Sequence, residues 1–219
     1  MATMIETYES ADDLADAASV AIADTLSTGI ALRGRASLVA TGGRSPGPVF
    51  DRLATMPMDW ARVTVTLSDE RCVDADHPDA NQRVVRERLL HGEAATARFL
   101  PLWPMPDPTR LNALLPFDAV MLGMGEDGHV ASLIPGDPGL EDAMTTADVT
   151  RRVPAGLGNP PLARITLTLR ALLNARAIFL LIAGPAKREV IERALAGEDL
   201  PVRRLIAQST APVRIFWSL

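Results

Sequence analysis

The sequence predicts an α/β fold, a mostly parallel sheet with helices on both faces. Short apolar runs recur along the chain, and they alternate with stretches of helical periodicity, which is the rhythm of successive strand and helix units. The composition, 47% hydrophobic and 22% charged, is that of an ordinary folded protein. A length of 219 residues is typical of one α/β domain, so we expect residues 1–219 to form a single domain.

The first predicted element is a helix over residues 10–29 that ends near Gly29. Ser10 can cap its first turn, with Asp13 three residues further on, which is the spacing of a capping box. Apolar residues recur every four positions and should pack on a sheet. They are Leu14, Ala18, Ile22 and Leu26.

Later segments alternate between strand and helix. The apolar runs predict strands at 36–41, 63–67, 117–123, 164–169, 177–183 and 213–217. Helices are predicted at 81–90, 169–175 and 186–196, and another should open near Pro46 or Pro48. Prolines and glycines predict two loop-like segments, at 101–116 and 135–161.

Charge and cysteine content exclude several classes of protein. The net charge of −5 and the pI near 5.2 argue against a surface built for nucleic acid, whose binding depends on neutralising phosphates. With one cysteine, Cys72, and three histidines, we expect neither a disulfide nor a closed zinc cage. Residues 1–9 lack the pattern of a signal peptide, and no apolar run is long enough to span a membrane. We expect a cytoplasmic protein without nucleic-acid or membrane partners.

Unusual polar clusters follow four of the apolar strands. They lie at 41–46, 68–71, 123–129 and 184–187. Ligands of open α/β sheets bind at the carboxyl ends of the strands. We therefore expect the four clusters to converge on one crevice.

Two of these clusters, together with an arginine, could hold a phosphate group. Gly42 and Gly43 allow a tight turn that brings N–H groups close to a ligand, and the Ser45 hydroxyl at a helix N-terminus would add to this site. A plain turn is the alternative. Arg164 and Lys187 could grip the same phosphate, since a cation at a helix start is disfavoured unless an anion is near. Ordinary solvated charge is the alternative for both.

The strand-end triplet Asp69, Glu70 and Arg71 combines acid and base. An acidic pair can position sugar hydroxyls or transfer protons, and an internal ion pair is the alternative. We interpret Glu70 as structural and favour functional roles for Asp69 and Arg71.

Residues 122–136 carry the sharpest signal, because four glycines, Asp127 and His129 directly follow an apolar strand. A histidine suits proton transfer near neutrality, and one flanked by glycines at a strand end is not shielded in a core. We favour catalysis for His129 over a structural role. Asp127 could orient the imidazole or hold the turn, and the pair lacks a credible third ligand for a metal.

Together these motifs resemble the 6-phosphogluconolactonases, within a larger group that also holds the glucosamine-6-phosphate deaminases. The resemblance covers nearly the whole chain and rests on five motifs in order. They are Thr41-Gly42-Gly43-Arg44-Ser45-Pro46, Ser68-Asp69-Glu70-Arg71, 123–129 with 131–136, Arg164-Ile165-Thr166-Leu167-Thr168 and Gly184-Pro185-Ala186-Lys187.

The resemblance implies a Rossmann-like domain in which the loop 42–45, Arg164 and Lys187 surround a phosphate. It implies that His129 is the acid-base residue and that Asp69 and Arg71 lie near the sugar ring. The chain departs from the family at Val130, where threonine is usual, and on both sides of Asn81, at Ala80 and Gln82. Arg44 replaces a small residue, and could contact phosphate or point to solvent.

The implied activity is hydrolysis of 6-phospho-D-glucono-1,5-lactone to 6-phosphogluconate in the pentose phosphate pathway, without cofactor or metal. His129 would take a proton from the attacking water and return it to the leaving ring oxygen. Arg71 or N–H groups of the glycine-rich turn would stabilise the oxyanion. The expected partner is a small sugar-phosphate lactone, and the expected state is a monomer or weak homo-oligomer.

Two other functions are weighed against this one. A glucosamine-6-phosphate deaminase would share the fold and the histidine, but Arg71 and the lack of an acidic residue over 131–136 argue against it. A silent sugar-phosphate sensor should carry a DNA-binding segment, for which the short acidic N-terminus leaves no room.

Overall fold

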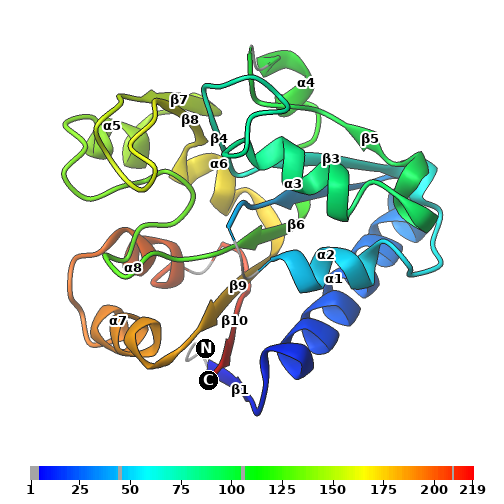
Figure 1. The fold of residues 1–219 in the computed structure, drawn as a ribbon, viewed down its shortest axis with the longest axis horizontal. Coiled ribbons are helices and arrows are strands. Elements are labelled where there is room, and N and C mark those ends of the chain that lie inside the picture. The colour runs from blue at the N-terminus through cyan, green and yellow to red at the C-terminus, as the bar shows by residue number, and fades with distance from the viewer. Residues whose placement is uncertain (1–4, 44–45, 105–106, 209) are drawn as a thin grey trace.

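The computed structural model describes residues 5–43, 46–104, 107–208 and 210–219. Its main feature is a seven-stranded sheet with the strand order β1-β10-β9-β6-β2-β3-β5, in which every neighbouring pair is parallel. A separate antiparallel sheet has the order β4-β8-β7. The predicted α/β fold with a mostly parallel sheet is confirmed, and Figure 1 shows the helices arranged around it.

The elements have the following bounds. The strands of the large sheet are β1 (Ile5–Tyr8), β2 (Ala36–Ala40), β3 (Val63–Leu67), β5 (Arg98–Phe99), β6 (Phe117–Leu122), β9 (Ala175–Ala183) and β10 (Val213–Ser218). Those of the small sheet are β4 (Asp69–Arg71), β7 (Thr150–Val153) and β8 (Arg164–Leu167). The helices are α1 (Ala11–Arg33), α2 (Gly47–Leu53), α3 (Asn81–Arg88), α4 (Pro108–Asn112), α5 (Leu140–Thr145), α6 (Leu169–Leu173), α7 (Pro185–Leu195) and α8 (Pro201–Ile206), with single turns of 3₁₀ helix at Trp60–Arg62 and Gly92–Thr96.

The centre of the large sheet is buried on both faces. Every residue of β2 and β6 is buried, which is why these strands are apolar runs without alternation. Leu38 of β2 lies opposite Val65 on one side and Ala119 on the other. These strands form the rigid platform on which the loops at their carboxyl ends are mounted.

Helix α1 begins as predicted, but the predicted end at Gly29 is wrong. The Ser10 hydroxyl accepts a hydrogen bond from the Asp13 N–H at 3.1 Å, and the helix runs on to Arg33, where Gly34 closes it at φ 72°. A Cβ on Gly29 would lie 3.0 Å from an Asp118 carboxylate oxygen and 3.1 Å from the Ala36 Cβ. Gly29 therefore lets the helix approach the sheet closely.

Several further expectations are corrected. The run at 164–169 forms β8 of the small antiparallel sheet, where Arg71 is opposite Arg164, instead of a strand of the parallel sheet. The two loop-like segments contain short elements, α4 in the first and α5 and β7 in the second. Residues 5–8, for which no element was predicted, form the edge strand β1. Such short or edge elements are stabilised by tertiary pairing, which local composition does not reveal.

The order in which successive strands are added to the sheet reverses between the parallel neighbours β2 and β6. From β2 the chain continues to its neighbour β3 on one side, whereas β6 leads to β9 on the other. Such a switch point leaves a crevice at the carboxyl ends of the two strands. No helix among the described residues is long and apolar enough to cross a membrane. The prediction of one domain over residues 1–219 stays a prediction.

Candidate active site

A cavity of about 230 Å³ opens at the switch point. Most of the residues that line it follow four neighbouring strands, β3, β2, β6 and β9, and Arg164 comes from β8 of the small sheet. The polar clusters thus come together as their positions suggested. The lining includes Gly42, Gly43, Asp69, Arg71, His129, Arg164 and Lys187. Arg44 and Ser45, which belong to the predicted phosphate loop, lie outside the described residues.

His129 lines the cavity and is bonded to Asp127, which does not line it. The imidazole Nδ1 lies 2.6 Å from Asp127 Oδ1, and the same oxygen accepts the His129 backbone N–H at 3.2 Å. Asp127 thus contacts both the ring and the backbone of the turn, and its role in orienting the imidazole stays a prediction. A partner on Nδ1 leaves Nε2 for other chemistry, and the His129 side chain is 27% exposed.

The electrostatics of this pair favour an ionised carboxylate. Partial burial alone would raise the pKa of Asp127, but the hydrogen bond from His129 and its charge outweigh burial, so the pKa of Asp127 lies below its ordinary value. An ionised Asp127 can accept a hydrogen bond from Nδ1–H, and its charge favours a positive charge on the ring.

Gly125 provides the space for the imidazole. A Cβ at this position would lie 2.3 Å from Nδ1 of His129 and 2.6 Å from Asp127 Oδ1, so no other residue fits without moving the pair. The turn is closed by hydrogen bonds between Gly125 and its neighbours, from the Gly125 N–H to the His129 carbonyl at 3.0 Å and from the Gly128 N–H to the Gly125 carbonyl at 3.1 Å. The glycine at position 125 is therefore explained by the placement of the histidine.

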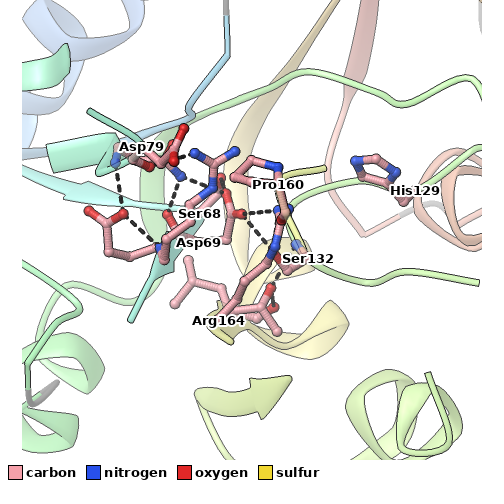
Figure 2. A network of polar contacts seen from close by, with 12 residues as sticks. Ser68, Asp69, Asp79, His129, Ser132, Pro160 and Arg164 are labelled. Carbon is pink, nitrogen blue, oxygen red and sulfur yellow. Dashed lines mark hydrogen bonds and ion pairs between the residues drawn. The ribbon is translucent and has the colours of Figure 1, made fainter. Parts of the chain in front are cut away.

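Asp69 and Arg164 belong to a buried polar network beside the histidine (Figure 2). The Ser132 hydroxyl donates to Asp69 Oδ2 at 2.6 Å, and Arg164 lies 3.8 Å from that oxygen while donating to the Pro160 carbonyl at 2.8 Å. The Ser68 hydroxyl donates to the other Asp69 oxygen at 3.0 Å. His129 lies to one side of this network in Figure 2, and His129, Asp69 and Arg164 all line the cavity.

Among the described residues, three cationic side chains line the cavity, and one of them, Arg164, is almost fully buried. Arg164 is 3% exposed, and burial lowers its pKa, an effect that Asp69 partly offsets. Arg71 donates to the Asp79 carbonyl at 2.5 Å, and Lys187 lies in the first turn of α7. Because guanidinium and ammonium groups bind phosphate well, the cavity is suited to an anionic ligand.

Glu70 has the structural role expected of it. It is fully buried, and its carboxylate accepts the N–H groups of Arg71, Asn81 and Gln82, each at 2.7 Å. The last two open α3, whose N-cap residue Ala80 supplies no side-chain bond. Burial raises the pKa of Glu70, and these three donors partly offset that effect. Glu70 is therefore a remote cap for α3.

Sequence reasoning missed two residues that organise the site. Asn81 donates to the Asp69 carbonyl at 2.9 Å and fills the space above Gly42, where a Cβ would lie 1.9 Å from the amide oxygen. Ser132 joins Asp69 to Arg164 through its hydroxyl. Ser132 lies inside one of the motifs and Asn81 lies outside all of them, and for both only the folded chain shows their partners.

Larger cavities exist elsewhere, and none of them contains the histidine. Cavities of about 1040 Å³ and 720 Å³ lie at the amino ends of the strands, away from all four polar clusters. We place the candidate active site in the smaller cavity because it collects an imidazole, a carboxylate and three cations. Among the described residues, no group of three or more His, Cys, Asp or Glu side chains is placed to hold a metal ion.

The fold and site agree with the comparison to known families. Residues 9–217 match the model of the family described as glucosamine-6-phosphate isomerases/6-phosphogluconolactonase. The chain belongs to this family, whose two activities both concern phosphorylated sugars.

Individual relatives narrow the assignment. A 6-phosphogluconolactonase of Caulobacter vibrioides is 41% identical, over 98% of this chain and 97% of the relative. One of Pseudomonas putida is 38% identical, over 97% and 93%. The crystal structure of a 6-phosphogluconolactonase from Shewanella baltica OS155 is 36% identical, with a TM-score of 0.93 over 100% of this chain and 98% of the other. Within the family, the chain falls among the 6-phosphogluconolactonases and is a lactone-hydrolysing enzyme.

Proposed function

We propose that the chain hydrolyses 6-phospho-D-glucono-1,5-lactone to 6-phosphogluconate, as its relatives are named for doing, and that His129 is the general acid-base residue. The observation that carries this proposal is the content of one cavity, an imidazole oriented by a carboxylate together with Arg71, Arg164 and Lys187. The imidazole can move a proton at neutral pH, and the cations match a phosphorylated substrate.

The proposed reaction uses Nε2 of His129. With Nδ1 bonded to Asp127, Nε2 takes a proton from water while the water oxygen attacks C1 of the lactone. The tetrahedral intermediate then collapses, the bond from C1 to the ring oxygen breaks, and that oxygen receives the proton from Nε2. One imidazole thus serves as base and then as acid, and no metal takes part.

The negative charge that develops on the carbonyl oxygen needs a donor. Arg71 is one candidate, because its guanidinium lines the cavity and is fixed at one end by the Asp79 carbonyl. The N–H groups of the glycine-rich turn are the other.

The phosphate group would serve as a remote handle. We propose that Arg164 and Lys187 bind it, with the loop 42–45, so that its binding energy positions C1 near His129. Asp69, whose carboxylate is held by the Ser132 hydroxyl, would accept hydrogen bonds from hydroxyl groups of the sugar. We further propose that the enzyme acts in the cytoplasm, within the pentose phosphate pathway, as a monomer or weak homo-oligomer.

The test is a coupled assay that follows freshly made 6-phosphogluconolactone with and without the enzyme, since the lactone also opens spontaneously. We expect a large acceleration with this substrate and a much smaller one with glucono-1,5-lactone, which lacks the phosphate. Equal rates with both lactones would contradict the phosphate site, and no acceleration would contradict the activity.

The same preparation tests the deaminase alternative. Asp69 is the one carboxylate among the described lining residues, and the nearest acidic residue after the histidine motif, Asp137, is buried against Arg151 at 3.3 Å instead of facing the cavity. We therefore expect no ammonia release from glucosamine 6-phosphate. Ammonia release at a rate comparable to lactone hydrolysis would favour the alternative.

A further inference from the structure

The second of the two larger cavities lies at the opposite end of the sheet from the candidate active site, and we call it the arginine cavity after the residues that line it. It has a volume of about 720 Å³, which is within the usual range of small-molecule sites. Its walls come from the end of α1, the first residues of β2, β5, β6 and β9, and helix α4. Nothing in the lactonase mechanism uses this region.

The charge of this cavity differs sharply from that of the whole chain. Six arginines line it, against two aspartates, Asp59 and Asp118, although the chain as a whole has a net charge of −5. The arginines are Arg33, Arg35, Arg62, Arg98, Arg110 and Arg176. Gathering so many like charges in a concave space raises their mutual repulsion, which an anionic ligand would relieve.

The two aspartates are already occupied. Asp118 is buried and pairs with both Arg33 and Arg176, while its other oxygen accepts the Ser37 N–H at 2.8 Å. Asp59 pairs with Arg62 at 2.7 Å. In the part of the chain that the structure describes, no carboxylate pairs with Arg35, Arg98 or Arg110, and all three are exposed to the solvent in the cavity.

We propose that this cavity binds a small molecule that carries two or more linked phosphate groups. Three guanidinium groups without carboxylate partners can each bind phosphate oxygens through two parallel N–H bonds. A single phosphate would leave most of the positive excess uncompensated, whereas a diphosphate or triphosphate balances it. The concave shape favours a small ligand over an extended polyanion, which binds along a charged stripe.

The adjoining cavity indicates that the ligand has an organic part. This cavity of about 1040 Å³ shares Arg33, Pro116 and Arg176 with the arginine cavity, and its wall includes Leu32 and Leu173. Leu32 is 73% exposed, so this wall offers an apolar surface that a ring can contact. A nucleoside diphosphate has this combination of linked phosphates and a ring.

Calorimetric titration with pyrophosphate and with ADP tests the proposal. The variant Arg98→Gln/Arg110→Gln removes two of the unpaired cations. The control Arg83→Gln/Arg193→Gln makes the same change of net charge at exposed arginines outside the cavity. We expect the dissociation constants of both probes to rise at least about 10-fold in the first variant, to stay unchanged in the control, and to rise with added salt.

Two further measurements separate this cavity from the active site. The Arg98→Gln/Arg110→Gln variant should hydrolyse 6-phosphogluconolactone at the parent rate, and its circular dichroism should match the parent's. The parent chain should bind pyrophosphate with its active site filled by 6-phosphogluconate. Equal binding of pyrophosphate by all three chains, or its complete displacement by 6-phosphogluconate, would overturn the proposal, as would binding of a glutamate polymer without binding of pyrophosphate.

Discussion

At the scale of single residues, the Asp127 carboxylate lies 2.6 Å from Nδ1 of His129. In the proposed mechanism this contact leaves Nε2 to react and stabilises the imidazolium that forms after proton transfer. The lowered pKa of Asp127 keeps this carboxylate ionised through the neutral and mildly acidic range. The stability that the ionised Asp127 carboxylate contributes to the fold is therefore fully present above the ordinary pKa range of aspartate. It is lost only as the pH falls through the lowered pKa of Asp127.

Replacing Asp127 with Asn should impair the histidine without removing it. We expect Asp127→Asn to lower kcat by at least about 10-fold, because the neutral amide no longer stabilises the imidazolium. KM should change little, because Asp127 does not line the cavity. Steady-state kinetics with 6-phosphogluconolactone measure both constants. An unchanged kcat would show that Asp127 only holds the turn.

Lys187 should contribute to binding more than to turnover. We expect Lys187→Gln to raise KM for 6-phosphogluconolactone at least about 10-fold, because a charge-assisted contact to the phosphate is lost. Arg193→Gln, on the same helix but paired with Glu198 at 2.7 Å, is the matched control and should leave KM unchanged. Steady-state kinetics of both variants check this, and an unaltered KM in Lys187→Gln would place the phosphate elsewhere.

At the scale of elements, helix α3 depends on a side chain that lies outside it. Glu70 replaces the missing N-cap by accepting N–H groups of Asn81 and Gln82, and α3 in turn places the Asn81 amide against Asp69 and Gly42. The cap therefore connects the stability of one helix to the shape of the active site.

Removing this cap should destabilise the fold. In Glu70→Gln an amide NH₂ faces backbone N–H donors, so we expect a loss of about 1–3 kcal/mol in the free energy of unfolding. Glu87→Gln, an exposed change at the other end of α3, should cost less than about 0.5 kcal/mol. Urea denaturation of the two variants measures the difference, and equal stabilities would contradict the role of Glu70.

The elements also show where sequence reasoning succeeds. The strands β2, β3, β6, β9 and β10 were predictable because each is a run of mostly apolar or β-branched residues, most of which are buried. From their ends the convergence of His129, Asp69 and Lys187 followed. The small sheet was not predictable, because β4 and β8 pair across 93 to 97 positions of the chain and neither carries a local signal of this partner. For the same reason the bond from Ser132 to Asp69 was missed.

At the scale of the whole molecule, the two ends of the parallel sheet carry different chemistry. The carboxyl ends gather the histidine and the cations of the active site, and the amino ends gather six arginines in a separate cavity. The fold explains the first arrangement through its switch point between β2 and β6. The second has no such general cause, which is why we assign it to a ligand.

Removal of metal ions should not affect turnover. In the proposed mechanism the imidazole activates water and guanidinium and ammonium groups balance the substrate's charge, so every step is assigned to side chains or N–H groups of the chain. We expect full activity after dialysis against EDTA, measured with 6-phosphogluconolactone. A loss of activity that a divalent cation restores would contradict the mechanism.

The turnover number of His129→Ala tests the central claim most directly. General acid-base catalysis contributes about 100- to 10,000-fold, so kcat for 6-phosphogluconolactone should fall by about that factor while KM changes little. His91→Ala is the control, because His91 is exposed and contacts the Arg88 carbonyl at 3.1 Å, far from the cavity lining. It should retain the parent rate. A folded His129→Ala enzyme with near-normal kcat would contradict the assignment of His129 as the acid-base residue.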